Sequence, residues 1–466
     1  MGWGSIRYRI KHHHVVGPKL SEENQKSVNR REEYLYNPLN GFTLIRRMYS
    51  DWTKIELFIR KTVGEDHLAV IRHYRPEMPT FTDILEASEA INRLQTVYDL
   101  KANDLVKGII NGQQYETKLK SIDSYFMGYY LFSKKLYYPA GFWLNSSLGN
   151  YEDENEFNKI VNFNKEKILE LYAETLVQQN RPVDALRFVT QASDLQPLDA
   201  HLLNRKNQIQ LLIHKSNDKP LEYPTPVISN YERGCRGDFS KHLSKLYCLY
   251  NTNTTSFLRL APIKMELLNF EPYMVLFHDI ISDKEIKHLI NLARPNLQRA
   301  AVYDNEASEL LVANERTSKV VWLDDDIDVI IKRLKQRISD MTGLNIADAE
   351  ELQVVNYGLG GHYEEHYDFF NATDSPTKVL ELGDRIATVL FYLSDVEQGG
   401  ATVFPKLETA VFPRKGSALM WYNLNNKVEI DEQTLHAACP VLVGSKWVCS
   451  KWIRSNAQIF KKPCYI

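Results

Sequence analysis

Two helical stretches are predicted near the start of the chain from the spacing of its apolar residues. Apolar side chains recur every three or four positions at Leu44, Ile45, Met48, Trp52, Ile55 and Phe58, and again at Ile84, Ala87, Ile91, Leu94 and Val97. This spacing places each set on one face of a helix, and Pro76 and Pro79 separate the two stretches. Residues 1–114 are therefore predicted to form an N-terminal helical domain, either a bundle or an oligomerisation arm.

Small residues recur between residues 120 and 215 in a pattern that indicates paired helices. One set occupies the closely packed positions of a roughly 34-residue tetratricopeptide unit: Ala173, Ala185, Ala192 and Pro197. A second set repeats part of the pattern upstream: Gly128, Ala140, Leu144 and Ser147. Residues 115–215 are predicted to be a tetratricopeptide-like module, with a generic helical bundle as the alternative.

Downstream of this module the pattern changes from helices to short strands. Prolines are frequent at the start of residues 216–262, which are predicted to be a linker that includes a loop between two cysteines. Helices are predicted at about 283–297 and 327–341. Beyond them, short alternating stretches with glycine-rich turns predict a β-barrel or sandwich, within a C-terminal domain spanning 263–466.

Composition narrows the class of protein. The chain of 466 residues is 44% hydrophobic and 25% charged, with a formal net charge of -2. This balance is typical of a soluble globular protein and excludes a strongly basic nucleic-acid-binding chain. No run of residues approaches the ~18 consecutive apolar positions of a membrane helix. We expect neither a nucleic-acid partner nor a membrane span.

The cysteines favour an oxidising compartment, whereas the first residues do not. The chain has five cysteines: Cys235, Cys248, Cys439, Cys449 and Cys464. The chain also carries three Asn-x-Ser/Thr sequons, which fit a secretory lumen. Residues 1–16 lack the apolar segment of a secretory signal. We interpret the chain as a lumenal protein with an incomplete or unusual N-terminus.

Two histidines and one aspartate form a candidate metal site. His366 and Asp368 are two residues apart on a predicted strand, so both side chains leave the same face. His436, at the start of a later predicted strand, offers a third ligand. Two imidazoles and one carboxylate leave positions open on the metal, as non-haem iron(II) needs for O₂ and a co-substrate. Zinc accepts the same ligands, so these residues alone do not choose the metal.

Lys446 indicates the co-substrate. 2-Oxoglutarate chelates iron at one end, and its far carboxylate, once buried, needs a cation. Lys446 follows residues 444–445, a predicted two-residue hairpin turn, and shares one strand face with Trp452, whereas Cys449 lies on the other face. A lone lysine is more often a solvated surface group. Its position relative to the three candidate ligands favours a pocket cation.

Around these residues the chain resembles the catalytic α subunits of animal collagen prolyl 4-hydroxylases. The resemblance is nearly continuous from residue 37 to 464 and is densest in residues 351–369, 383–405 and 436–452. It implies a multidomain chain, α then α+β, in which a double-stranded β-helix (jelly-roll) catalytic domain follows the helices. It also implies hydroxylation of proline in collagen-like peptides with O₂ and 2-oxoglutarate.

The resemblance assigns roles to particular residues. Four residues match the iron ligands and the cation that holds the far carboxylate of 2-oxoglutarate: His366, Asp368, His436 and Lys446. Related lysine hydroxylases have arginine at the cation position, so Lys446 favours a prolyl enzyme. Tyr357 and Thr388 are implied to touch 2-oxoglutarate, and Trp452 is implied to line the mouth of the active site.

The resemblance further implies partners and disulfides. L-ascorbate is the implied rescuer of over-oxidised Fe²⁺, and protein disulfide isomerase is the implied β subunit of an α2β2 assembly in the endoplasmic reticulum lumen. The chain ends at Ile466 without a retention signal, so residence in the lumen is expected to come from that partner. The implied disulfides are Cys235–Cys248 and Cys439–Cys464, with Cys449 as a small buried hydrophobe.

The chain departs from the family in two segments. The family begins with a signal peptide and a dimerising helix, whereas the match here starts only near residue 36. In the helical module the family presents tyrosines to a proline-rich peptide in the polyproline II conformation. The aligned positions here hold Phe132, Leu171, Glu174 and Val177. Because the hydroxyl groups are lost and a carboxylate enters, we expect weak or altered binding of poly-proline.

Two other functions stay open. The altered module is compatible with an iron/2-oxoglutarate hydroxylase that acts on another proline-containing peptide. Formation of hydroxyproline in (Pro-Pro-Gly) repeats separates the two enzymes. The third hypothesis is that the chain is a non-catalytic, peptide-binding subunit. The complete set of metal ligands with a pocket cation argues against it.

Overall fold

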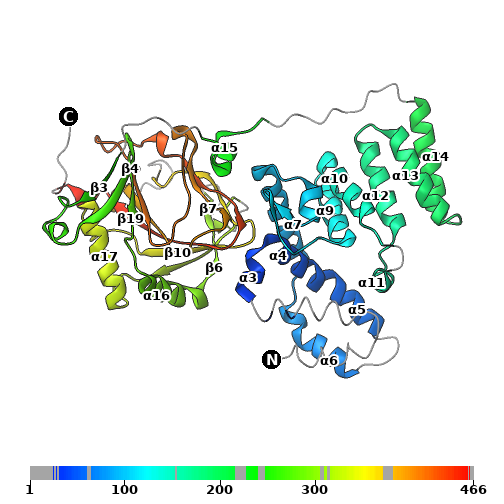
Figure 1. Ribbon diagram of the computed structural model, residues 1–466, viewed down its shortest axis with the longest axis horizontal. Coiled ribbons are helices and arrows are strands. Elements are labelled where there is room, and N and C mark those ends of the chain that lie inside the picture. Colours follow the sequence, from blue (N-terminus) through cyan, green and yellow to red (C-terminus); the bar gives the residue numbers. More distant parts are fainter. Residues whose placement is uncertain are drawn as a thin grey trace. The chain divides into compact units, whose positions relative to one another are not determined.

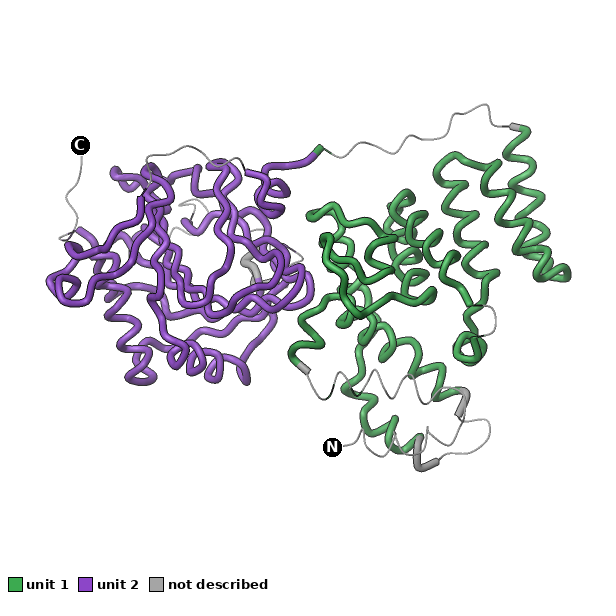
Figure 2. Tube along the Cα trace, viewed as in Figure 1, with its two compact units in different colours: residues 1–227 green, residues 228–466 purple. Residues whose placement is uncertain are grey.

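Figure 1 shows the computed structural model of the chain, in which residues 25, 28, 31–59, 65–152, 155–215, 227–239, 247–304, 309–311, 315–370, 381–459 and 461 are described. The chain divides into two compact units, residues 1–227 and 228–466 (Figure 2). Unit 1 is mainly helical and unit 2 carries the large sheets. None of the described helices combines the length and the hydrophobicity that crossing a membrane requires.

The helices of unit 1 follow the apolar periodicity of the sequence. Its elements are α3 (Arg31–Tyr36), α4 (Pro38–Arg46), the π-helical turn η1 (Arg47–Asp51), α5 (Trp52–Ile59), α6 (Glu65–Tyr74), η2 (Arg75–Glu77), α7 (Phe81–Tyr98), α8 (Ala102–Val106), β1 (Ile109–Ile110), β2 (Gln113–Gln114), α9 (Ser121–Ser133), α10 (Tyr137–Gly149), α11 (Glu156–Ile160), α12 (Lys165–Gln178), α13 (Pro182–Leu195) and α14 (Ala200–Lys215). Thr80 and Asp83 form a capping box at the start of α7, and the predicted apolar face of that helix is buried.

A buried ionic cluster joins two segments of unit 1 between which a domain boundary was predicted at residue 114. Arg46, at the end of α4, is fully buried and lies 2.6 Å from Asp51. The same guanidinium pairs with Asp123 in the first turn of α9. Burying a charge is costly unless it is paired, so the cluster binds these helices to each other. Residues on both sides of 114 therefore belong to one compact unit.

Close helix pairs follow in unit 1, as the small residues predict. Helix α9 packs on α10 and α12 packs on α13. Gly128 faces Leu144 so closely that an added Cβ would lie 2.6 Å from Leu144 Cγ. The side chains of Ala173, Ala185 and Ala192 are buried between helices. A larger residue at these positions would force the paired helices apart.

The described part of unit 2 contains one large sheet, one smaller sheet, two two-stranded sheets (β7-β8 and β13-β18) and two covering helices. Its elements are α15 (Asn230–Arg236), β3 (Cys248–Asn251), η3 (Ser256–Arg259), β4 (Ile263–Phe270), β5 (Tyr273–His278), α16 (Asp283–Ala293), η4 (Arg294–Asn296), β6 (Gln298–Arg299), β7 (Val302–Asp304), β8 (Glu309–Leu311), β9 (Lys319–Leu323), α17 (Val329–Thr342), β10 (Leu352–Tyr357), β11 (Tyr363–His366), β12 (Arg385–Tyr392), β13 (Gln398–Gly399), β14 (Thr402–Phe404), η5 (Pro405–Leu407), β15 (Thr409–Val411), β16 (Ala418–Tyr422), η6 (Glu432–Thr434), β17 (His436–Ala438), β18 (Val441–Val443), β19 (Lys446–Arg454) and η7 (Asn456–Gln458). The two helices predicted upstream of the strands are confirmed as α16 and α17.

The large sheet separates the apolar core from the site. Its order is β3-β4-β5-β16-β12-β19-β10-β9-β6, and the smaller sheet has the order β11-β17-β14-β15. One face of the large sheet packs on α16 and α17 through a cluster that includes Leu289, Ile338, Val389 and Cys449. The opposite face of β10, β12 and β19, together with β14 and β17, encloses a second cluster and the pocket described below.

Three expectations from the sequence differ from the structure. Residues 228–262, assigned to a linker, supply α15 and also β3, which pairs with β4 in the large sheet. Residues 444–445 do not make a hairpin turn, because β18 pairs with β13 whereas β19 pairs with β10 and β12. Gly444, with φ +112, lets the chain change sheets at this corner. Strand β11 ends at His366, so Asp368 lies just beyond it.

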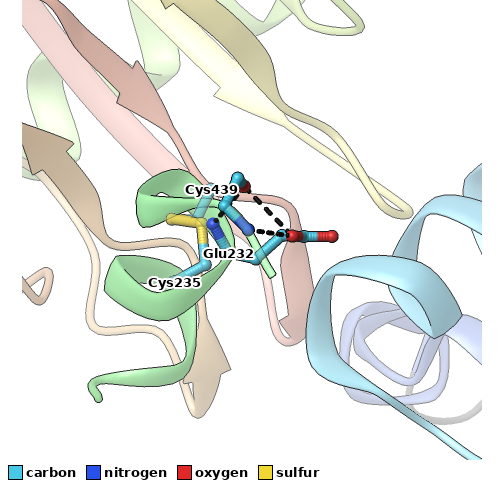
Figure 3. Close-up of a disulfide and its surroundings, with 4 residues drawn as sticks. Glu232, Cys235 and Cys439 are labelled. Atoms are coloured by element: carbon cyan, nitrogen blue, oxygen red, sulfur yellow. Dashed lines mark hydrogen bonds between the residues drawn. A yellow bond between two sulfur atoms is a disulfide. The ribbon is translucent and has the colours of Figure 1, made fainter. Parts of the chain in front are cut away.

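The implied disulfide pairing is wrong in the structure. Cys235 is bonded to Cys439, with 5.5 Å between their Cα atoms, although 204 positions separate them in sequence (Figure 3). Helix α15 packs against β14, which pairs with β17, and this packing brings Cys235 beside Cys439. Cys248 is consequently an exposed free thiol and Cys449 a buried one. Cys464 lies outside the described residues.

Candidate iron and 2-oxoglutarate site

The three candidate metal ligands meet in one pocket of unit 2. His366 ends β11, Asp368 follows it, and His436 begins β17, directly opposite His366 in the smaller sheet. Their ligand atoms lie within 4.8 Å of one another. His366 Nε2 is 3.8 Å from Asp368 Oδ1, and His436 Nε2 is 3.6 Å from Asp368 Oδ2. The predicted triad is therefore gathered around one point.

Both imidazoles are oriented for metal binding by the backbone two residues upstream. The Nδ1 of His366 lies 2.7 Å from the carbonyl oxygen of Glu364, and the Nδ1 of His436 lies 2.9 Å from that of Thr434. A carbonyl only accepts, so each Nδ1 carries the proton and each Nε2 is left as a lone-pair donor. Burial, and then His436, lower the pKa of His366 to about 3, which keeps that imidazole neutral.

Asp368 is held as a carboxylate. Burial pushes its pKa upward, but the nearby His436, His366 and Arg385 and a hydrogen bond from Thr388 outweigh burial and lower the pKa to about 2. Thr388 Oγ1 donates to Asp368 Oδ2 at 2.7 Å, and Asn423 Nδ2 donates in turn to Thr388 Oγ1 at 3.0 Å. Two imidazoles that present Nε2 and a fixed carboxylate are a donor set that fits iron(II).

Thr388, implied to touch 2-oxoglutarate, lines the pocket, but its hydroxyl proton is used to orient Asp368. Replacing Thr388 with valine removes this hydrogen bond at nearly constant volume. We expect the affinity for Fe²⁺ to fall by about tenfold or more. Equilibrium dialysis under anaerobic conditions measures the change. Thr409→Val, which removes a hydroxyl from β15 outside the pocket lining, serves as the control, and equal affinities for both variants would contradict this role.

Lys446 places a buried ammonium in the same pocket. The residue is 1% exposed, and its Nζ lies 5.3 Å from the ring centre of Tyr357 and 6.0 Å from that of Tyr392. Within the described part of the chain, this ammonium has no hydrogen-bond or ion-pair partner. Burial lowers its pKa to about 7. An unpaired buried ammonium is costly to the fold, and pairing with the carboxylate of a ligand would offset this cost.

Binding of 2-oxoglutarate is expected to depend on pH through Lys446. Only the ammonium form pairs with a carboxylate, and above about pH 7 the free enzyme increasingly carries the neutral amine. The KM for 2-oxoglutarate should therefore rise by up to about tenfold per pH unit above that value, while kcat stays nearly constant. Steady-state kinetics of the iron-loaded enzyme test this. A Lys446→Arg variant stays charged and should lack this rise; a flat wild-type profile would contradict the assignment.

The alternation predicted for β19 is confirmed. Four of its residues line the pocket, namely Lys446, Val448, Ser450 and Trp452, whereas Cys449 faces the apolar core and Lys451 pairs with Asp325 on that other side. Tyr357 lines the pocket beside Lys446, opposite it in the β10–β19 register. All residues that were predicted to bind iron or 2-oxoglutarate therefore share one pocket with Trp452.

Arginines at the pocket were not predicted from the sequence. Arg385 donates from Nη1 to the backbone oxygen of Asp368 at 3.2 Å, and Glu350 holds its guanidinium at 2.5 and 2.6 Å. The same guanidinium lies 4.3 Å from the ring centre of Trp452. Arg316 lies 4.7 Å from the ring centre of Tyr363, which stacks on His366. These arginines and aromatic rings lie beside the candidate metal ligands. No local sequence motif predicts their positions.

The four positions predicted to contact a peptide lie in unit 1, one on α9 and three on α12. Phe132 is half-buried against Tyr137. Val177 packs into the core between α12 and α13, and Leu171 is half-buried on α12. Glu174 is bound by both arms of the Arg205 guanidinium, which reaches it from α14. The entering carboxylate is thus neutralised by an arginine of the next helix.

Two protein-family models match the chain. The N-terminal region of the prolyl 4-hydroxylase alpha subunit matches residues 8–112, and the 2OG-Fe(II) oxygenase superfamily matches residues 352–454. The expectation that similarity to the family starts only near residue 36 is therefore wrong, because the first match begins at residue 8. The second match covers the three candidate iron ligands and Lys446. Among solved structures, the 2OG complex of a viral collagen prolyl hydroxylase from Paramecium Bursaria Chlorella virus-1 aligns with 39% of this chain and 96% of its own, at 26% identity and a TM-score of 0.33.

Curated relatives match almost the whole chain. Prolyl 4-hydroxylase subunit alpha-2 of Caenorhabditis elegans is 40% identical over 93% of this chain and 83% of its own length. Subunit alpha-1 of Rattus norvegicus is 35% identical, and that of Homo sapiens 34% identical, each over 96% of this chain and 88% of the relative. At this identity and coverage, the chain belongs to the family of prolyl 4-hydroxylase alpha subunits.

Proposed function

We propose that this chain hydroxylates proline residues of collagen-like peptides at C4, as a 2-oxoglutarate-dependent dioxygenase. The observation that carries the proposal is the meeting of His366, Asp368 and His436 with the unpaired ammonium of Lys446 in one buried pocket. When bound, iron(II) with 2-oxoglutarate and O₂ supplies the oxidising chemistry, in which the keto acid becomes succinate and CO₂.

The chain's own residues bind and orient the reactants. The Nε2 atoms of His366 and His436 and the Asp368 carboxylate would hold the metal, and a set of three protein ligands is one that can also admit O₂ and a co-substrate. Lys446 receives the far carboxylate of 2-oxoglutarate, which fixes the direction in which the keto acid lies. Apolar and aromatic residues, among them Leu390, Val448 and Trp421, exclude water from this end of the pocket. Trp452 and Arg316 also line the pocket.

Product analysis tests the proposal. The purified chain is supplied with Fe²⁺, 2-oxoglutarate, ascorbate and a (Pro-Pro-Gly) repeat peptide, and 4-hydroxyproline is measured together with succinate. We expect one oxygen atom in the peptide for each succinate formed. Succinate without hydroxyproline from this peptide, but with hydroxylation of a different proline-containing peptide, would favour the second candidate function and contradict the collagen-like substrate.

The second candidate is favoured by one observation in unit 1. Its helix pairs fit a tetratricopeptide-like peptide-binding module, but Glu174 is committed to Arg205 and Leu171 offers no hydroxyl. The charged pair is poorly suited to bind an uncharged polyproline II helix. A docked peptide would remove water from both charges without replacing their hydrogen bonds. The substrate that this module selects is therefore expected to differ from pure poly-proline.

Poly-proline is expected to bind the chain weakly. Restoring aromatic hydroxyl groups with Leu171→Tyr and Glu174→Tyr should tighten binding by about tenfold or more, since each buried tyrosine adds apolar contact and a donor. Isothermal titration of poly-proline into the wild-type and doubly substituted chains measures the difference. Tight binding by the wild type, unaffected by the two substitutions, would contradict the altered-module interpretation.

The proposal includes the setting in which the enzyme acts. We propose a jelly-roll catalytic domain, rescue of over-oxidised iron by L-ascorbate, and residence in the endoplasmic reticulum lumen. We further propose an α2β2 assembly with protein disulfide isomerase as the β subunit. Family membership and the disulfide in unit 2 support these statements. Co-purification of the secretory-targeted chain with that partner tests the assembly; a soluble, active and retained chain without it would contradict the partner.

A further inference from the structure

The disulfide of unit 2 lies directly behind the candidate iron site. Cys439 is the first residue after β17, and His436 is the first residue of that strand. Three residues of extended strand, about 10 Å, therefore connect the metal ligand to the disulfide. The backbone N–H of Cys439 also donates to the carbonyl oxygen of Ala401 at 2.8 Å, next to the start of β14. A displacement of Cys439 is transmitted to His436 along this strand.

Helix α15 covers the outer face of the smaller sheet, where the disulfide attaches it (Figure 3). Gly234 lies so close to β14 that an added Cβ would be 3.0 Å from Val403 Cγ1. Asn230 Nδ2 donates to the carbonyl oxygen of Pro405 at 3.3 Å, and Arg233 pairs with Glu408 at 3.4 Å. Seven residues are too few for a helix that is stable alone. The position of α15 therefore depends on these contacts and on the disulfide.

The inner face of the same sheet holds His436. Phe404 follows Val403 on β14 and points to the opposite face, where its ring stacks on that of His436 with 5.5 Å between centres. The ring of Trp421 meets the imidazole edge to face at 4.8 Å. The orientation of His436 is thus fixed by the spacing between β17 and β14, and the disulfide ties α15 across these two strands.

We propose that the Cys235–Cys439 disulfide is a positioning element of the iron site, which keeps His436 aligned with His366 and Asp368. The bond touches neither the metal nor a substrate and acts through β17. This inference rests on the proposed function, because it takes His436 as an iron ligand. Both cysteines of the bond are buried.

The other described cysteines supply a matched control. Cys248 is a free thiol on β3, at the edge of the large sheet, and it is exposed. Cys248→Ser therefore removes one sulfur atom from the same unit and leaves both the disulfide and the pocket lining intact. The paired Cys235→Ser and Cys439→Ser substitutions remove the bond without creating a new free thiol.

The test is the anaerobic Fe²⁺ affinity of the full, metal-free chain. We expect the Fe²⁺ affinity of the double variant to be lower than that of the wild type by about tenfold or more, the usual effect of losing a group that orients a metal ligand. The Fe²⁺ affinity of Cys248→Ser should equal that of the wild type. At saturating Fe²⁺ the kcat of the double variant should return towards the wild-type value. A double variant with a lower melting temperature and an unchanged Fe²⁺ affinity would overturn the inference alone. A wild-type chain that binds no Fe²⁺ would overturn the proposed function as well.

If the double variant does not fold, the Fe²⁺ affinity of the unaltered chain can be measured with the disulfide reduced and with it intact. A dithiol reductant opens the bond: the dithiol is oxidised to its disulfide, and two hydrogens pass to Cys235 and Cys439. After removal of the reductant, Fe²⁺ affinity should be lower by the same factor and should recover on reoxidation. Peptide mapping of the oxidised chain should find Cys235 joined to Cys439. A map with Cys235 joined to Cys248, or an affinity indifferent to reduction, would refute the positioning role.

Discussion

Replacing His366 with alanine is expected to abolish succinate release from 2-oxoglutarate, to below about one thousandth of the wild-type rate. His366 contributes one of three metal-binding atoms within 4.8 Å of one another. Its loss opens the triad, and the chemistry supplied by the metal is worth several kcal/mol of barrier. The measurement is succinate release from labelled 2-oxoglutarate, with and without a proline-rich peptide.

A second histidine of unit 2 provides the control. His278 is at the end of β5, where its ring lies 3.0 Å from Glu266, and it does not line the pocket. His278→Ala should keep activity within about twofold of the wild type, as for most substitutions away from a site. If His366→Ala and His278→Ala retained similar activity, the metal triad would be assigned to the wrong residues.

Replacing Lys446 with methionine is expected to change co-substrate binding and stability in opposite directions. The far carboxylate of 2-oxoglutarate would enter the pocket unpaired, so its KM should rise about 100-fold or more. In the absence of 2-oxoglutarate the same change removes an unpaired buried ammonium, whose pKa burial lowers to about 7. The melting temperature should therefore increase, by about 2–4 °C for each kcal/mol gained.

Lys451 is the matched control for Lys446, because it lies on the opposite face of the same strand. It is buried and paired with Asp325 at 2.6 Å, on the side away from the pocket. Lys451→Met should lower the melting temperature, since it leaves Asp325 with only the more exposed Lys335, 3.2 Å away, as its cation partner, and it should not change the KM for 2-oxoglutarate. The same pattern in both variants would mean that Lys446 is an ordinary structural lysine.

Local pattern was enough to predict the chemistry of the site. The alternation of β19 placed Lys446 and Trp452 on one face and Cys449 on the other, because a strand has a period of two residues. His366 and Asp368 were selected from their two-residue spacing, with His436 on a later predicted strand as the third ligand, and the structure sets the two histidines opposite each other in one sheet. The helices also followed from periodicity, including the buried face of α7.

Features that depend on contacts between distant segments were not predictable. The Cys235–Cys439 bond spans 204 positions and follows from the packing of α15 on β14, which no local spacing encodes. The turn at residues 444–445 resembles a hairpin, and only the pairing of β18 with β13 shows that the chain changes sheets there. Arg46 likewise joins two predicted domains through carboxylates that flank it from separate helices.

We infer that one pocket binds iron through two imidazoles and a carboxylate, and binds a dicarboxylate through an ammonium. A crystal structure of the chain prepared anaerobically with Fe²⁺ and 2-oxoglutarate measures this directly. We expect one metal ion bound by His366, Asp368 and His436, with the keto acid on the metal and its far carboxylate on Lys446. A metal bound elsewhere, or a carboxylate that leaves Lys446 unpaired, would contradict it.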